Sequence, residues 1–389
     1  MARREKGTGS IYQRENGTWV GVLREISLVT GKPKSKYFSG KTEAEVKRKI
    51  REYNRQGRPS ETNVKRLSVS DYLDAWLKTY KMPVLKSSSY DRLENTVQHQ
   101  IKPNIGMIQI NQLTSEDIQN MLTKLKNEDG YSYSIVKKAY DCMNDVLRHA
   151  LIREDIVKNP MLLVRMPEKS LFPTKEIRIF TDRESALITE EVCRQYSTGA
   201  PVYVYGDAYI LMLNTGLRLG EVIGLEKSDW DPKKKTISVK RNIQSVKKRD
   251  SKGVAITGKE LVTNTTKTYS GERTVPLNEN ATAALERMCL NHPDSKWIVC
   301  SGKGEMVTPE RVERTFYRVL KNLDIPQAGT HSLRHTFASL LFAEGVDIKT
   351  VSTILGHASI QITLNTYVHL LEKADHNAVA KLDNVICST

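Results

Sequence analysis

Basic side chains and a tyrosine recur at short spacings in the C-terminal half of the chain. His331 and Arg334 are three residues apart, so their side chains can point to one side of a helix. We expect that helix to begin close to His331, and a helix N-terminus favours a bound phosphate. Upstream lies Arg218, and downstream lie His357 and Tyr367. Each residue alone is ordinary, and a surface His–Arg pair would look the same, but the set suggests a site for an anion.

Two of the histidines also have the spacing of zinc ligands. His331 and His335 are four residues apart, as in the HExxH motif of metalloproteases. Ser332 stands where that motif needs its glutamate, so a metalloprotease is disfavoured and His335 is expected in the core or behind the site. The five cysteines lie far apart and form no CxxC pair, which argues against a zinc ribbon or a disulfide framework.

The charge of the chain favours a polyanionic partner. Its 389 residues carry a formal net charge of +15, and residues 1–65 hold 16 Lys and Arg against 7 Asp and Glu. Such an excess favours nucleic acid over a membrane surface, although a basic solvated tail is the alternative for this segment. No apolar run approaches the ~18 residues of a membrane span, and no apolar signal segment follows the N-terminus. We therefore expect no membrane association, and the dispersed thiols fit a reducing cytoplasm.

The first part of the chain is expected to form a small sheet and one helix. Asn16-Gly17 is a hairpin signal between two segments that alternate apolar and polar side chains. The expected strands lie at residues 9–14, 18–25 and about 34–39. A helix follows from Thr42, where Glu45 completes a capping box. A small basic sheet of this kind fits the major groove of DNA.

Helices dominate the rest of the chain. Within a bundle over 66–167, helices are expected at about 70–82, 88–101, 115–127 and 133–151. Segments 57–67 and 166–180 have the composition of linkers. From Thr181 the pattern is mainly helical, interrupted between about 235 and 277 by a small β-sheet or hairpin. The predicted fold class is multidomain α+β.

The motifs taken together resemble the tyrosine recombinase (phage integrase) family. The segments that carry the resemblance are TGLRLGEVIGL, HSLRHTFASLLFAEG and ILGHASIQITLNTYVH. Their order, Arg, Lys, His-x-x-Arg, His and Tyr, is highly specific, and the N-terminal part is more loosely similar to the arm-binding domain of conjugative-transposon integrases. The resemblance implies a site-specific DNA recombinase, the integrase of a mobile element. Such an enzyme cuts and rejoins DNA through a 3′-phosphotyrosine intermediate for integration and excision.

The resemblance also implies a role for each residue of the motifs. Arg218 and Arg334 would clamp the non-bridging phosphate oxygens, because a guanidinium group matches phosphate bidentately. His357 would add a hydrogen bond to those oxygens. Tyr367 would attack phosphorus, and His331 is the expected acceptor of its proton.

The leaving 5′-oxygen needs a proton, and the resemblance implies a lysine within the segment TTKTYSGERTVPL. Lys267 is the predicted donor, with Lys259 and Lys252 as alternatives. Glu221 lies one helical turn beyond Arg218 and is expected to orient that arginine. Side chains thus fill the roles of charge neutralisation and proton donation, and the phosphotyrosine keeps the energy of the broken bond. We therefore expect no metal and no cofactor.

The resemblance implies a division into three domains and a set of partners. The expected domains are an arm-type DNA-binding domain at 1–64, a helical core-site DNA-binding domain at 66–167 and a catalytic domain at 173–389. Double-stranded DNA at the element ends and the target site would be bound by a homotetramer, with weak self-association when DNA is absent. Apolar spacing within 372–386 suggests a connector between protomers. An excisionase or a host DNA-bending protein is a candidate auxiliary partner, and the enzyme would be bacterial, cytoplasmic and DNA-associated.

Two other functions are compatible with this chemistry. A type IB-like topoisomerase would use the same residues without exchanging partners, but the separate basic N-terminal segment argues against it. A catalytically inactive DNA-binding regulator would need no intact site, but all six catalytic positions are filled.

Overall fold

The computed structural model of the chain divides into two compact units, Met1–Pro173 and Thr174–Thr389. The described residues are 10–26, 33–56, 67–173, 177–251, 253–265 and 272–367. Within these ranges, no helix combines the length and the apolar character needed to cross a membrane. Lys252, Lys267 and the expected connector segment 372–386 lie outside the described residues.

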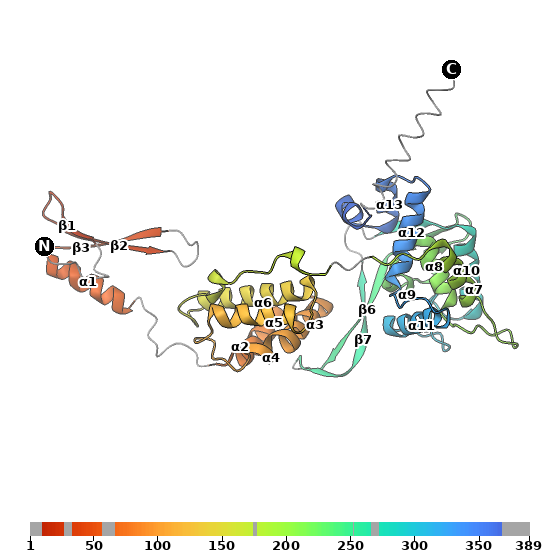
Figure 1. Cartoon of the computed structure of the whole chain (residues 1–389), viewed down its shortest axis with the longest axis horizontal. Helices are drawn as coiled ribbons and strands as arrows, with labels where there is room; N and C mark the ends of the chain where they lie inside the picture. The colour runs from red at the N-terminus through yellow and green to blue at the C-terminus, as the bar shows by residue number, and fades with distance from the viewer. Residues whose placement is uncertain are drawn as a thin grey trace, which may run out of the picture. The chain divides into compact units, whose positions relative to one another are not determined.

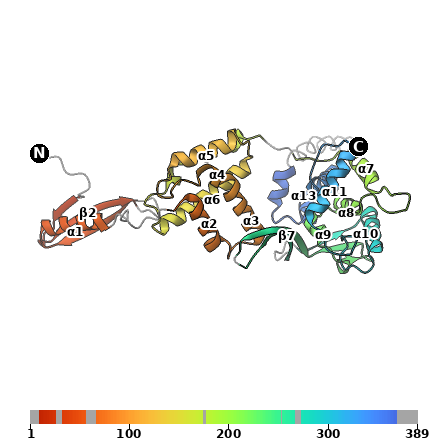
Figure 2. The same cartoon turned by 90° about the horizontal axis from the view of Figure 1, so that it is seen from below.

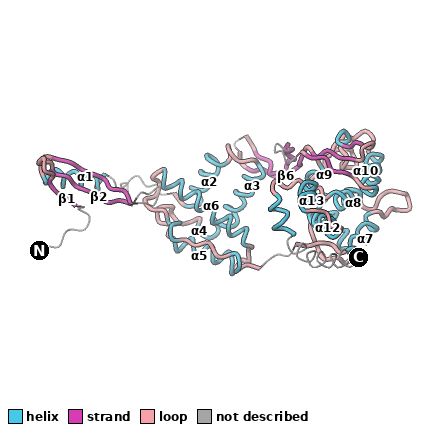
Figure 3. The backbone as a smooth tube through the Cα atoms, turned by 90° about the horizontal axis from the view of Figure 1, so that it is seen from above, coloured by secondary structure: helices cyan, strands magenta, loops and turns pink. Residues whose placement is uncertain are grey.

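A three-stranded antiparallel sheet and one helix open the first unit (Figure 3). The strands are β1 Ser10–Gln13, β2 Trp19–Ile26 and β3 Pro33–Gly40, in the order β1-β2-β3, and the helix is α1 Glu43–Gln56. Val46 and Ile50 of α1 are buried where Gly21 of β2 allows close approach, since a Cβ on Gly21 would lie 2.6 Å from Ile50 Cδ1. The expected sheet and helix are confirmed.

Local sequence signals set the turn of this sheet and the start of its helix. Between β1 and β2 the amide of Arg14 donates to the carbonyl of Thr18, and Gly17 has a left-handed φ of +78°. The amide of Glu45 donates to Thr42 Oγ1 at 3.2 Å. The Glu45 carboxylate accepts from the amide of Lys41 at 2.9 Å, so the capping box reaches one residue further back than its usual form.

A helical bundle fills the rest of the first unit, as expected (Figure 2). Its helices are α2 Val69–Trp76, α3 Ser87–Thr96, α4 Lys102–Ile105, α5 Ser115–Asn127 and α6 Tyr133–Ile152. The π-helical turns η1 Leu77–Lys81 and η2 Val97–Ile101 extend α2 and α3. Apolar side chains at helical spacing, among them Leu73, Leu122 and Met143, form the core. Inside it the Tyr72 hydroxyl donates to Asp155 at 2.8 Å.

The connection between the two units is shorter than the sequence suggests. Composition favours a linker over 166–180, but Phe172 is 6% exposed and packs edge-on against Tyr133 with ring centroids 5.4 Å apart. Phe180 is buried in the core of the second unit, and its amide donates to Thr336 Oγ1 at 2.9 Å. Burial of two aromatic rings therefore outweighs the loop preference of the neighbouring prolines and charges.

The second unit is mostly helical. Its helices are α7 Asp182–Val192, α8 Gly206–Thr215, α9 Leu219–Ile223, α10 Glu279–Asn291, α11 Pro309–Asn322, α12 His331–Ala343 and α13 Ile348–Leu355. Helix α8 lies between α10 and α12 and contacts both (Figures 1 and 3). Because neighbours surround α8, most of its side chains are buried.

Two small antiparallel β elements complete the second unit. One is a three-stranded sheet of β4 Trp230–Asp231, β5 Thr236–Val239 and β8 Arg273–Pro276, and the other is a hairpin of β6 Arg241–Arg249 and β7 Ala255–Thr265. The hairpin extends beyond the helices of its unit (Figure 1). The predicted β interruption of the helical pattern, and with it the predicted fold class, is confirmed.

Candidate active site

Glu221 joins two arginines from distant parts of the second unit. Arg218 precedes α9 and donates to Glu221 Oε1 at 2.9 Å, and Arg273 at the start of β8 donates to Glu221 Oε2 at 2.8 Å. Burial alone would raise the pKa of the Glu221 carboxyl, but the hydrogen bond and charge of Arg273, together with Arg218, lower the pKa to about 2. Glu221 therefore stays ionised and fixes both guanidinium groups.

Arg334 is buried, and its side chain joins the ends of two helices. Its Nη1 donates to the carbonyl of Gly216 at 2.7 Å, and its Nη2 donates to the carbonyl of Leu355 at 2.8 Å. Each carbonyl lies at a helix C-terminus that ends in left-handed glycine backbone, at Gly216 and Gly356. Burial and then the charge of Arg218 lower the pKa of Arg334, yet a guanidinium group remains charged near neutral pH. The two backbone contacts therefore fix the position of this charge.

The three arginines leave an excess of positive charge around the Glu221 carboxylate. The charges of Arg218 and Arg334 both lower the pKa of His331 and the pKa of His357. Each histidine therefore lies within electrostatic range of both arginines. Such a group of fixed cations matches the charge of a phosphodiester and the charge that builds up on its oxygens during attack.

The two histidines of α12 lie next to each other. The rings of His331 and His335 are 4.9 Å apart at an interplanar angle of 84°. His331 is exposed at the surface, but neighbouring protein atoms displace part of the water around its ring. This loss of solvation, followed by the charges of Arg334 and Arg218, lowers the pKa of His331. Burial, followed by His331 and Arg334, lowers the pKa of His335 to about 4. Both rings are therefore neutral at pH 7.

His357 is held by a buried hydroxyl. Its Nδ1 lies 2.7 Å from Thr363 Oγ1, and Thr363 is fully buried. A Thr363 hydroxyl that donates to Nδ1 leaves the ring proton on Nε2, which is the tautomer able to donate to a phosphate oxygen. Burial and then the charges of Arg334 and Arg218 lower the pKa of His357 to about 4. Thr363 is thus a supporting residue of the site.

Tyr367 is placed differently from the expectation. Its side chain is 1% exposed and packs against Phe342, and its hydroxyl lies 2.8 Å from Nδ1 of His335. His331, the expected proton acceptor, makes no hydrogen bond to Tyr367 among the described residues. Burial raises the pKa of Tyr367 to about 12, and the opposing effect of Arg334 is smaller. The hydroxyl is therefore protonated in this position.

Of the three candidate lysines for proton donation, the structure describes one, Lys259. Lys267 and Lys252 lie outside the described residues. Lys259 of β7 forms an ion pair with Glu310 of α11 at 2.5 Å. This ion pair is exposed on both sides, and Lys267 stays the predicted proton donor.

Two further supporting residues, Arg273 and Glu313, were not expected from the sequence. Arg273 donates through Nε to the carbonyl of Ile354 at 2.7 Å, so it ties Glu221 to the end of α13. Glu313 of α11 accepts from the amide and the hydroxyl of Thr330 at 2.9 and 2.7 Å, and so fixes the start of α12. Arg273 falls within the segment TTKTYSGERTVPL, whereas Glu313 has no motif that could have revealed it.

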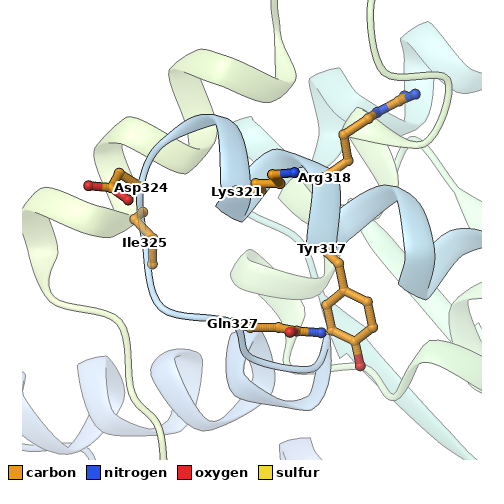
Figure 4. A pocket seen from close by; sticks show the side chains of 6 residues that line it. All are labelled: Tyr317, Arg318, Lys321, Asp324, Ile325 and Gln327. Carbon is orange, nitrogen blue, oxygen red and sulfur yellow. The ribbon is translucent and has the colours of Figure 1, made fainter.

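A surface pocket lies away from this group of residues. It has a volume of about 420 Å³ and is lined by Tyr317, Arg318, Lys321, Asp324, Ile325 and Gln327. The Arg318 side chain points away from Gln327 (Figure 4), and none of the six is a candidate catalytic residue. A duplex is bound over a wide surface rather than in a small pocket. Among the described residues, no group of three or more His, Cys, Asp or Glu could hold a metal ion.

The neutral histidines predict a dependence of stability on pH. Unfolded histidines take up protons as the pH falls below 6.5, but folded His335 and His357 resist protonation until about pH 4. The urea midpoint of the second unit should therefore fall as the pH is lowered from 6.5 towards 4. A variant with both histidines changed to Asn should show a shallower fall, and equal slopes would contradict the expectation.

Two parts of the chain match known protein families. Residues 193–374 match the phage integrase family, and residues 68–126 match the phage integrase N-terminal SAM-like domain. A tyrosine recombinase XerC-like protein of Caldanaerobacter subterraneus subsp. tengcongensis is 28% identical over 377 residues, which cover 91% of this chain and 93% of that protein. The transposase of transposon Tn916 of Enterococcus faecalis is 26% identical over 286 residues, covering 69% of this chain and 66% of that protein.

The fold also has a counterpart among solved structures. The Tn1549 transposon integrase, in complex with transposon right end DNA, has a TM-score of 0.65 at 21% identity, covering 82% of this chain and 100% of that chain. The sequence matches cover part of the bundle and most of the second unit, including the arginines, the histidines and Tyr367. The chain belongs to the phage integrase family of tyrosine recombinases.

Proposed function

We propose that this integrase cuts and rejoins the ends of its element with Tyr367 as nucleophile. The hydroxyl oxygen would attack phosphorus, form a 3′-phosphotyrosine and release a 5′-oxygen. The reverse attack by a 5′-hydroxyl of another strand would restore the phosphodiester and free Tyr367. The observation that carries this proposal is the group of fixed arginines and neutral histidines, of which Arg334 lies within electrostatic range of Tyr367 and His335 within hydrogen-bond distance of it.

The remaining roles follow from the chemistry of the same group. Arg218 and Arg334 would bind the non-bridging oxygens, supported by the Glu221 and backbone contacts that fix them. His357 would donate from Nε2 to one of these oxygens. His331, exposed beside the arginines, would accept the proton of Tyr367 as the hydroxyl attacks. Lys267 would protonate the leaving 5′-oxygen.

We further propose the division of labour among the parts of the chain. The basic sheet at 1–64 would bind arm-type sites, the bundle at 66–167 would bind the core site, and 173–389 would carry the chemistry. Exchange of strands between two duplexes requires four cuts, so we infer a homotetramer on DNA with 372–386 as the connector between protomers. An excisionase or host DNA-bending protein would set direction, and the enzyme would act on DNA in the bacterial cytoplasm.

Tyr367→Phe tests the assignment of the nucleophile. The change removes the attacking oxygen but no positive charge, so the variant should form no covalent protein–DNA product while its affinity for DNA is retained. A nicked core-site duplex, which traps the adduct, provides the measurement, with denaturing electrophoresis as the readout. Tyr72→Phe is the matched control, because that buried hydroxyl donates to Asp155 in the other unit. Covalent product from the Tyr367 variant would overturn the assignment.

A further inference from the structure

The nucleophile proposed above lies in an apolar part of the second unit. Tyr367 belongs to a small core with Ala338, Phe342, Val351 and Leu355. Its side chain is 1% exposed, and its ring centroid lies 5.5 Å from that of Phe342. In this position the hydroxyl makes its hydrogen bond inside the protein, to His335, instead of being directed to the surface. Tyr367 must therefore leave this position before it can attack.

The Tyr367 hydroxyl forms a hydrogen bond with one side-chain nitrogen in these apolar surroundings. Nδ1 of His335 lies 2.8 Å from Tyr367 Oη, and the two rings meet edge to face with centroids 5.7 Å apart. The imidazole is neutral and the phenol is protonated, so the hydroxyl donates and Nδ1 accepts. A buried hydroxyl without such an acceptor is unfavourable, and the bond therefore stabilises the buried position.

His335 contacts Tyr367, whereas His331, the histidine of the family motif, makes no hydrogen bond to Tyr367 among the described residues. The ring of His331 meets that of His335 edge to face with centroids 4.9 Å apart, but His331 is itself exposed. Both histidines come from α12, one turn apart, so a single helix presents one ring to the surface and one to the core. The adjacent Phe342 lies two turns beyond His335 on the same helix and contacts Tyr367 as well.

We propose that His335 is a positioning residue that holds Tyr367 in this buried resting position and thereby limits how often the nucleophile is exposed. The inference rests on the proposal that Tyr367 is the nucleophile, but the position of its side chain can be measured without any reaction on DNA. His335 would act through Tyr367 and would not touch the phosphate.

Nitration by tetranitromethane of the full-length protein alone measures the exposure of each tyrosine. Tryptic peptide 350–373 contains Tyr367 as its only tyrosine, so mass spectrometry reads its nitration directly. Peptide 67–78 contains only Tyr72, which is 5% exposed and serves as the protected standard. Peptide 7–14 contains only Tyr12, which is 45% exposed and serves as the reactive standard.

Two substitutions of nearly equal polarity separate the hydrogen bond from general packing. In His335→Asn the amide oxygen occupies the place of Nδ1, whereas in His335→Gln it lies one bond further from the backbone. Tyr367 should stay as protected as Tyr72 in the native protein and in the Asn variant. In the Gln variant its nitration should rise by about tenfold or more, because losing a buried hydrogen bond shifts an opening equilibrium by that order.

Equal nitration of Tyr367 in the Asn and Gln variants, or native reactivity equal to that of Tyr12, would overturn the proposal. Adduct formation on nicked core-site DNA gives a second readout, and the Gln variant should form adduct at least as fast as the native protein. A tenfold slower rate with unchanged nitration would instead make His335 a participant in cleavage. Absence of adduct from the native protein would count against the nucleophile assignment alone, because nitration requires no DNA.

Discussion

Replacement of Glu221 by Gln should destabilise the second unit by about 3–5 kcal/mol, because removing one partner of a buried ion pair leaves the other charges uncompensated. The Glu221 side chain is 4% exposed and the Arg273 side chain is 7% exposed, so water cannot replace the lost carboxylate charge. The change keeps the size of the side chain. Urea denaturation, read by hydrogen exchange of the amides of α9 and α12, measures the loss in the second unit separately.

The matched control is Glu279→Gln at the start of α10. Glu279 also pairs with a cation, Lys235 at 3.3 Å, but its side chain is 91% exposed. The same chemical change should therefore cost less than about 1 kcal/mol, because exposed pairs and helix-terminal charges contribute little. Cleavage should be lost in the Glu221 variant even under conditions where it is folded, since Arg218 is then free to rotate. Equal stabilities of the two variants would contradict the central place given to Glu221.

Lys267→Ala should slow cleavage of ordinary DNA by about 10²- to 10⁴-fold, the usual effect of losing a general acid. The leaving alkoxide needs a proton because its conjugate acid is very weak. A sulfur in place of the bridging 5′-oxygen leaves as a thiolate, whose conjugate acid has a pKa near ~8.5 in cysteine. Most of the defect of the Lys267 variant should therefore vanish on the sulfur substrate. Single-turnover cleavage of both substrates gives the ratio.

Two control variants make this test specific. Arg218→Ala should stay slow on both substrates, because its proposed contact is to the non-bridging oxygens. Lys259→Ala should show no rescue by sulfur, because Lys267 is the predicted proton donor. Rescue of the Lys259 variant alone would show that the wrong lysine had been chosen. Rescue of neither variant would make Lys252→Ala the next to be tested, and rescue of none of the three would move proton donation to another group, with His331 as the next candidate.

The elements that were predicted well are those specified by neighbouring residues. Thr114 and Thr181 begin their helices with capping boxes, in which the partners are three residues apart. The helices of the bundle follow the apolar spacing of the sequence, because burial of one face dominates their stability. The π-helical turns η1 and η2 carried no comparable signal, and the connection between the units is shorter than its composition implies.

In the candidate site, too, features set by neighbouring residues could be predicted and features set by distant residues could not. The motif residues were predicted by type and order, but the contacts that fix them join residues far apart in sequence. Arg273 reaches Glu221 across 52 positions, and no local pattern encodes that pairing. The position of His335 beside His331 on one helix was visible in the sequence, yet the contact with Tyr367 depends on how α12 packs against the following chain. Tertiary packing, rather than local propensity, decides which of the two histidines meets the tyrosine.

The backbone contacts of Arg334 also bear on when the enzyme becomes active during its synthesis. Its two carbonyl partners lie 118 residues before it and 21 residues after it. A growing chain holds the first partner early but cannot complete the pair until the second has left the ribosome. Arg334 can therefore take its fixed position only after the chain has been made past Leu355, which is late in a chain of 389 residues.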